Sequence, residues 1–199
     1  MRKESPIIFS TPMVQAILDG RKTQTRRIIK ISPRISSDPN IDLKKYYDEM
    51  REYILSFCPF GTAGDLLWVR EKWKENETPT GYPYHHYADD DVYTNKDNEK
   101  WKPSIHMPKE ACRLRLEVES VRVERLQDIS EEDAELEGAQ PVLYHSLSQR
   151  MEVIEPSHIF YEQAYAKFQT GFKMLWQKIN GQKSWDENPW VWVILFKVL

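Results

Sequence analysis

The apolar positions at the start of the chain predict a short strand followed by a helix. The run PIIFS at 6–10 is apolar and brief, which favours a buried strand. Thr11 and Pro12 then form a helix-start signal, with a hydroxyl to cap free N–H groups and a proline where its missing N–H does no harm. Apolar residues follow at helical spacing as far as Gly20, which suits the left-handed position that ends a helix.

The basic run GRKTQTRR at 20–27 therefore leaves a helix and enters an extended segment. The β-branched residues Thr23 and Thr25 favour a strand, in which alternate side chains point to opposite faces. We expect Thr23 and Thr25 to share a face and Lys22 to lie at the bend where the strand starts.

Three further segments have strand-like patterns. LLWVREKW at 66–73 is a strand candidate. CRLRLEVESVRVERL at 112–126 alternates clearly, but its phase changes, which predicts a bulge or tight turn near 119–120, in either one long bent strand or a hairpin. WVWVILFKVL at 190–199 is apolar on both faces and suits a central strand of a closed or well-covered sheet.

Two later segments predict helices. Ser130 opens SEEDAELEG, where Asp133 completes a capping box and Gly138 ends a short helix. Apolar residues from 159 to 179 follow a helical period, although Gly171 can break or bend the helix.

Polar, charged segments separate these elements at about 31–58, 74–100 and 139–158, and we interpret them as surface insertions. We expect an amphipathic helix in the first segment and a loop in the last. Several short strands with few helices describe an α+β fold, a small β-barrel or curled sheet with flanking helices and surface insertions. No internal repeat or second core is visible, so we predict a single domain over 1–199.

Composition limits the classes of function. The chain has 199 residues, is 40% apolar and carries seven Trp, ten Tyr and seven Phe, which excludes a disordered protein. Lys and Arg total 28 against 31 Asp and Glu, a net charge of -3, so any nucleic-acid binding must use a local patch.

Cysteine and histidine positions indicate neither a disulfide scaffold nor a metal site. Cys58 and Cys112 lie far apart, which favours a reduced, intracellular protein. The adjacent His85 and His86 lack the i, i+4 spacing that places two ligands on one helical face, and His106 belongs to no metal motif. No segment reaches the about 18 apolar residues of a membrane span or forms a signal peptide, so we expect a cytoplasmic location.

Several blocks in order resemble the ASCH-domain family of the PUA-like superfamily: PIIFSTPMVQAILDGRKTQTRR, GDLLWVREKW, WKPSIHMP, VERLQDISEEDAELEG and NPWVWVILF. The chain looks most like the longer ASCH proteins of phages and prophages, except over 31–57 and parts of 74–100 and 139–158. The resemblance implies a small PUA-like β-barrel and a role in handling RNA or nucleotides.

One branch of that family, the small bacterial N4-acetylcytidine amidohydrolases, uses a Lys, Thr and Glu set, and its motifs match Lys22, Thr25 and Glu137 here. The resemblance implies Lys22 as general base, Thr25 as nucleophile or water-positioning group, and Glu137 as the group that orients them, with no metal or cofactor. This chain is longer, and Gln24 lies between the threonines, so its pocket can differ. The alternative is an ion pair of Lys22 with Glu137, with Thr25 simply suited to a strand.

Other residues are candidates for ligand contact. Arginine matches phosphate oxygens, and alternation places Arg27 on the face of Thr25 and Arg26 on the opposite face, so we expect Arg21 and Arg27 to contact the ligand and Arg26 to face elsewhere. Trp68 and Arg70 border the pocket by resemblance, where a ring can stack on a base; core packing of Trp68 is the alternative.

The sequence thus predicts a protein that binds RNA or a modified nucleoside and hydrolyses an amide such as that of N4-acetylcytidine. A non-catalytic RNA- or modified-DNA-binding module is the alternative, and a ribonuclease is a third, without an obvious pair of histidines to support it. A buried Glu137 within hydrogen-bonding reach of Lys22 would favour chemistry, whereas a solvent-facing Glu137 would favour simple binding. The oligomeric state stays open.

Overall fold

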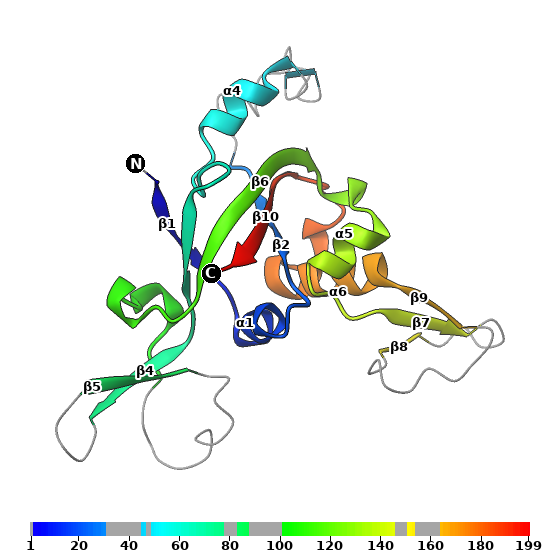
Figure 1. The fold of residues 1–199 in the computed structure, drawn as a ribbon. Coiled ribbons are helices and arrows are strands. Elements are labelled where there is room, and N and C mark those ends of the chain that lie inside the picture. The colour runs from blue at the N-terminus through cyan, green and yellow to red at the C-terminus, as the bar shows by residue number, and fades with distance from the viewer. Residues whose placement is uncertain are drawn as a thin grey trace. The chain divides into compact units, whose positions relative to one another are not determined.

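The computed structural model describes residues 2–30, 45–46, 49–77, 83–87, 101–145, 151–153 and 164–199. These residues form a mixed α and β structure with four α-helices and a five-stranded sheet in the order β1-β3-β6-β10-β2 (Figure 1). The strands of this sheet are β1 (Glu4–Ile8), β2 (Gln24–Ile28), β3 (Leu66–Arg70), β6 (Arg115–Arg125) and β10 (Trp190–Val198).

The pairing of β1 with β3 is parallel, whereas β3 with β6 and β10 with β2 pair antiparallel. Because β1 and β2 are the end strands in this order, the sheet is open, and the predicted closed barrel is not confirmed. The apolar run at 190–199 does form the inner strand β10, buried from Trp190 to Ile194.

By its contacts the chain divides into two compact units. Unit 1 comprises Met1–Gly20, Cys58–Ser120 and Phe196–Leu199, and unit 2 comprises Arg21–Phe57 and Val121–Leu195. Strands β6 and β10 each contribute residues to both.

Unit 1 begins with β1 and the helix α1 (Thr11–Leu18). The N-cap of α1 is Ser10, without a side-chain cap hydrogen bond, so the predicted cap by the Thr11 hydroxyl is wrong: Thr11 is already the first helical residue. Gly20 has φ +73°, the left-handed conformation predicted for the end of the helix. The other elements of unit 1 are β4 (Trp73–Glu77) and β5 (Pro83–Tyr87), which pair antiparallel, and the 3-10 helices η2 (Ser104–His106) and η3 (Lys109–Ala111).

The predicted strand at 66–73 is interrupted after Arg70, and β4 begins at Trp73. Between them, the buried Glu71 forms a partly buried ion pair with Arg113, with Nη2 to Oε2 at 2.9 Å. The phase change in β6 is confirmed, since Leu116 and Val118 are buried, Glu119 and Ser120 are both exposed, and the burial pattern resumes beyond them.

Unit 2 contains the helices α4 (Arg51–Ser56), α5 (Glu131–Leu136) and α6 (Phe168–Asn180), the 3-10 helices η4 (Leu126–Asp128) and η6 (Gln182–Ser184), and a sheet of β7 (Val142–His145), β8 (Met151–Val153) and β9 (Ala164–Lys167) in the order β8-β7-β9. The predicted loop at 139–158 thus includes β7 and β8. The helix expected within 31–58 is present as α4, and much of the rest of that segment lies outside the described residues.

The helix predicted over 159–179 begins only at Phe168. Residues 164–167 form β9 instead, because they pair with β7, while 159–163 lie outside the described residues. The start of α6 is fixed by Glu131 on α5, whose Oε2 accepts from the backbone N of Phe168 at 2.7 Å and of Gln169 at 3.3 Å.

Of the break or bend expected at Gly171, the break does not occur, because α6 is continuous from Phe168 to Asn180. A Cβ at that position would lie 1.8 Å from the backbone O of Gln140, so glycine allows the helix to approach this carbonyl closely.

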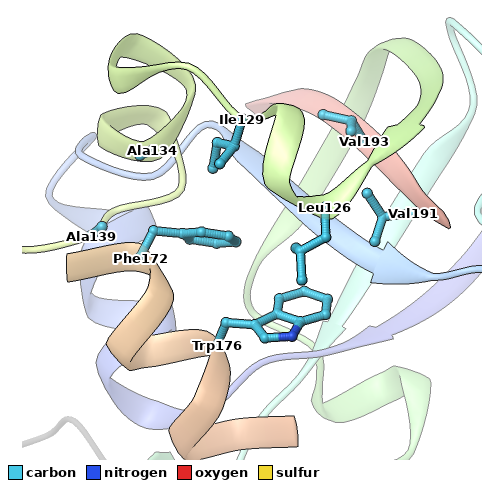
Figure 2. Packing of buried hydrophobic residues seen from close by; sticks show 8 residues of the cluster. All are labelled: Leu126, Ile129, Ala134, Ala139, Phe172, Trp176, Val191 and Val193. Atoms are coloured by element: carbon cyan, nitrogen blue, oxygen red, sulfur yellow. The ribbon is translucent and has the colours of Figure 1, made fainter. Parts of the chain in front are cut away.

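A hydrophobic cluster holds α5 and α6 against β10 in unit 2. Figure 2 shows Phe172 and Trp176 projecting from α6 toward Leu126 and Val191. Large apolar side chains each contribute about 1.5–3 kcal/mol on burial, so this cluster fixes α5, which carries part of the candidate site. The complete cluster is Leu126, Ile129, Ala134, Ala139, Phe172, Trp176, Val191 and Val193.

Within the described part of the chain, no helix has the length and apolar character needed to cross a membrane.

Candidate functional site

The entry into β2 lies beside the end of α5 in unit 2. Lys22 and Glu137 form an antiparallel bridge, and the backbone N of Thr23 donates to the backbone O of Leu136 at 2.9 Å. The local sequence explains both ends of α5. At its start, Ser130 Oγ accepts from the backbone N of Asp133 at 3.0 Å, as the capping box predicts, and just after its end Gly138 has φ +75°.

The side chains of Lys22 and Glu137 meet in the interior. Nζ of Lys22 donates to Oε2 of Glu137 at 2.9 Å, to the backbone O of Glu137 at 2.8 Å and to the backbone O of Gln24 at 2.7 Å. The side chains are only 1% and 4% exposed, so the ion pair is almost fully removed from water.

Burial lowers the pKa of Lys22 below its usual value, and the charge and hydrogen bond of Glu137 oppose this only in part. The positive charges of Arg27 and Arg26 lower the pKa further. Lys22 therefore loses its proton more easily than a lysine in water, and the neutral amine that results can accept a proton.

Arg26 joins the same cluster, so the expectation that it faces elsewhere is wrong. Its Nη1 donates to Oε1 of Glu137 at 3.1 Å, its Nε to Oε1 of Glu124 at 3.1 Å, and its Nη2 to Oδ2 of Asp133 at 2.8 Å. The guanidinium also lies 5.7 Å from the ring centroid of Phe172 on α6. Burial opposes the charge on Arg26, but the carboxylates of Glu137 and Glu124 outweigh burial and raise its pKa.

Arg122 on β6 closes the arrangement. Its Nε donates to Oε2 of Glu124 at 3.0 Å, its Nη1 to the side-chain Oε1 of Gln24 at 3.2 Å, and its Nη2 to Oδ2 of Asp133. Hydrogen bonds thus run in a closed circuit, which we call the polar ring: Lys22, Gln24, Arg26, Arg122, Glu124, Asp133 and Glu137.

The polar ring has a partly exposed side and a buried side. The side chains of Arg122, Asp133 and Glu124 are 40%, 21% and 16% exposed, respectively. Lys22, Arg26 and Glu137 are buried. A ligand that reaches the ring from solvent would therefore meet Arg122 first.

Sequence reasoning identified Lys22 and Glu137 but missed the other members of the ring. Positional parity could have found them. Residues 22, 24 and 26 share one face of the segment that becomes β2, and 122 and 124 share a face of β6. Asp133 in the first turn of α5 and its C-cap Glu137 are i, i+4 neighbours.

The remaining candidates of the basic run lie close by along the chain. Thr25 is buried in β2 opposite Ile194 of β10, and strand alternation directs its side chain away from the face of Gln24 and Arg26. Arg27 is half-buried, and burial lowers its pKa, with partial compensation by the charge of Glu137. Arg21 is exposed.

Trp68 and Arg70 contact each other within unit 1. The guanidinium of Arg70 lies 5.1 Å from the ring centroid of the half-buried Trp68. Nε of Arg70 donates to the backbone O of Met107 at 3.0 Å, and Nη2 of Arg70 donates to the backbone O of Ile105 at 2.6 Å. Arg70 thus holds the segment around η2 in place, and its contact with a ligand stays a prediction.

The described residues contain no group of three or more His, Cys, Asp and Glu side chains arranged to hold a metal ion. His106 is exposed at the end of η2, and the side chains of His85 and His86 lie outside the described part of the chain.

Comparison of the chain with protein-family models, with curated proteins and with solved structures finds no match. The chemistry of the site must therefore be judged from its own geometry. That geometry combines a desolvated lysine, a carboxylate that holds it in place and a ring of further polar groups that reaches solvent.

Proposed function

We propose that the chain is an ASCH-like protein of the PUA-like superfamily that binds a nucleobase-containing ligand and hydrolyses an amide such as that of N4-acetylcytidine. The observation that supports this most directly is the buried contact of Lys22 Nζ with Glu137 Oε2 at 2.9 Å. A buried glutamate that holds a lysine of lowered pKa is the arrangement expected of a general base and its orienting group.

In this reaction Lys22, as the neutral amine, removes a proton from a water, because strand alternation directs the Thr25 side chain away from the face of Gln24 and Arg26. The oxygen adds to the acyl carbon, the C–N bond breaks, and Lys22 returns the proton to the leaving nitrogen. The oxygen of the water thus ends on the acyl group and one of its hydrogens on the leaving nitrogen, so the products are acetate and cytidine. Glu137 keeps the amine in place throughout.

Charge balance favours a neutral ligand over a nucleic-acid backbone. In the polar ring, the cations Lys22, Arg26 and Arg122 are matched by an equal number of carboxylates. Nucleic-acid binding uses positive charge that is available to phosphates. A neutral modified nucleoside therefore suits the ring better than the alternative of a nucleic-acid-binding module.

The test is to incubate the purified protein with N4-acetylcytidine and to measure cytidine and acetate by chromatography. Lys22→Ala should abolish release. Thr25→Val keeps the side-chain shape, so loss of release in this variant would show that the Thr25 hydroxyl takes part in the reaction. Lys178→Ala, at an exposed position of α6, is the matched control and should retain activity. Absence of cytidine release by the unaltered protein would refute the hydrolase.

A further inference from the structure

Gln24 is the neutral member of the polar ring, and its amide is only partly satisfied. The residue is 1% exposed. Its side-chain Oε1 accepts from Arg122 Nη1 at 3.2 Å and its backbone O accepts from Lys22 Nζ at 2.7 Å. Its Nε2, which carries two N–H donors, has no hydrogen-bond partner among the described residues.

Arg122 determines which way this amide points. A guanidinium only donates, so the amide must offer its oxygen to Arg122. The opposite orientation would set N–H groups of Gln24 against N–H groups of Arg122. The donor nitrogen of Gln24 therefore does not contact Arg122, and the backbone O of the same residue accepts from Lys22.

A buried donor without an acceptor costs free energy, and native proteins rarely keep one without a reason. A ligand oxygen would remove the cost. The same donor would also reject ligands that lack an acceptor, because binding them leaves it unsatisfied.

The charges of the ring indicate what kind of acceptor this is. The positive and negative charges of the ring are equal in number. When Lys22 loses its proton, one carboxylate is left in excess, and the positive charge of Arg27 can at most cancel it. A phosphate or carboxylate ligand would find no excess of positive charge. A neutral carbonyl oxygen accepts from an amide N–H without needing one.

We propose that Gln24 Nε2 determines specificity by donating a hydrogen bond to a neutral carbonyl oxygen of the ligand. This rests on the proposed function for the choice of ligand, an N4-acylated pyrimidine, which offers two such oxygens, the 2-oxo group of the base and the acyl oxygen. Gln24 thus recognises the ligand, whereas Lys22 and Glu137 carry out the reaction.

Two variants isolate the donor. Gln24→Leu removes the whole amide, whereas Gln24→Glu keeps an oxygen for Arg122 and removes the N–H groups. Each should raise KM or Kd for N4-acetylcytidine roughly twofold to tenfold, the range for one neutral hydrogen bond, while kcat changes little for Gln24→Leu. Gln182→Leu, at an exposed position of η6, is the control and should leave KM unchanged.

Three ligands then locate the acceptor: cytidine has only the 2-oxo group, 4-acetamidopyridine has only the acyl oxygen, and N4-acetylcytidine has both. If Gln24 contacts the 2-oxo group, Gln24→Leu weakens cytidine binding and leaves 4-acetamidopyridine unaffected. If it contacts the acyl oxygen, the pattern is reversed.

Side-chain amide NMR signals of ¹⁵N-labelled glutamine give a readout that needs no catalysis. The Gln24 signal, assigned with Gln24→Leu, should shift when the preferred ligand binds. Binding and this shift without hydrolysis would refute the proposed function and leave the inference intact. Equal binding of all three ligands by Gln24→Leu and the unaltered protein, or no binding by the unaltered protein, would overturn the inference.

Discussion

Replacing Glu137 by Gln should destabilise the protein strongly. Glu137 accepts from Lys22 Nζ at 2.9 Å and from Arg26 Nη1 at 3.1 Å, and the side chains of both cations are no more than 1% exposed. Removing one partner of a buried ion pair costs about 3–5 kcal/mol, because the remaining charge stays buried. Glutamine keeps one acceptor oxygen, so we expect the lower end, about 3 kcal/mol.

For a chain of this size, each 1 kcal/mol corresponds to about 2–4 °C in Tm, so Glu137→Gln should melt roughly 6–12 °C lower. Thermal unfolding followed by circular dichroism measures this, and urea unfolding should show a lower midpoint with an unchanged slope. Glu135→Gln is the matched control, since Glu135 lies on the same helix but is exposed. Equal melting temperatures for the two variants would show that Glu137 does not neutralise buried charge.

Further predictions concern pH and backbone. If neutral Lys22 is the base, kcat/KM should rise with pH as its proton is lost, with the midpoint below the usual 10.5 because burial lowers its pKa; a rise centred at 10.5 or above would argue against this. Burial acts to raise the pKa of Asp133, but the hydrogen bond from Arg26 helps to outweigh it, so the pKa lies below 3.8. The Asp133 carboxylate therefore stabilises the protein above pH 3.8, and this stabilisation is lost as pH falls through the lowered pKa. Asp133→Asn should be less stable than the unaltered protein near neutral pH, and the difference in urea unfolding should shrink in acid. Gly171→Ala should destabilise more than Gly20→Ala, because its Cβ would overlap a backbone oxygen at 1.8 Å, whereas at Gly20 only the positive φ is unfavourable, at about 1 kcal/mol; equal losses in thermal melts would contradict the close approach.

Local rules predicted the elements whose partners lie within a few residues. The capping box from Ser130 to Asp133, the left-handed Gly20 and the change of phase in β6 all follow from short-range geometry. The segment at 164–167 was missed, because its apolar residues fit a helical period and only its pairing with β7 makes it a strand.

Only part of the site could be predicted, because many of its contacts join residues that are far apart in the sequence. Alternation separates Arg26 from Arg27, but it does not reveal which face is covered by acids from distant segments. Only the fold brings Glu124 and Asp133 to Arg26 and makes that face the buried one. Gln24 was noted as a departure from the family motif, and its role depends on Arg122, which strand β6 supplies.

The contact of Lys22 with Glu137 joins positions 115 residues apart, which bears on how the protein is made. At translation rates of about 5–20 residues per second, Lys22 is synthesised roughly 6–23 s before Glu137. Contacts between residues this far apart in the sequence also form slowly, because a long loop must close, at a cost in chain entropy, before the contact stabilises the fold. During that interval Lys22 lacks the carboxylate that pairs with it, and an N-terminal fragment that ends before Glu137 cannot form this ion pair. Recovery of ligand binding should therefore coincide with the last phase of refolding.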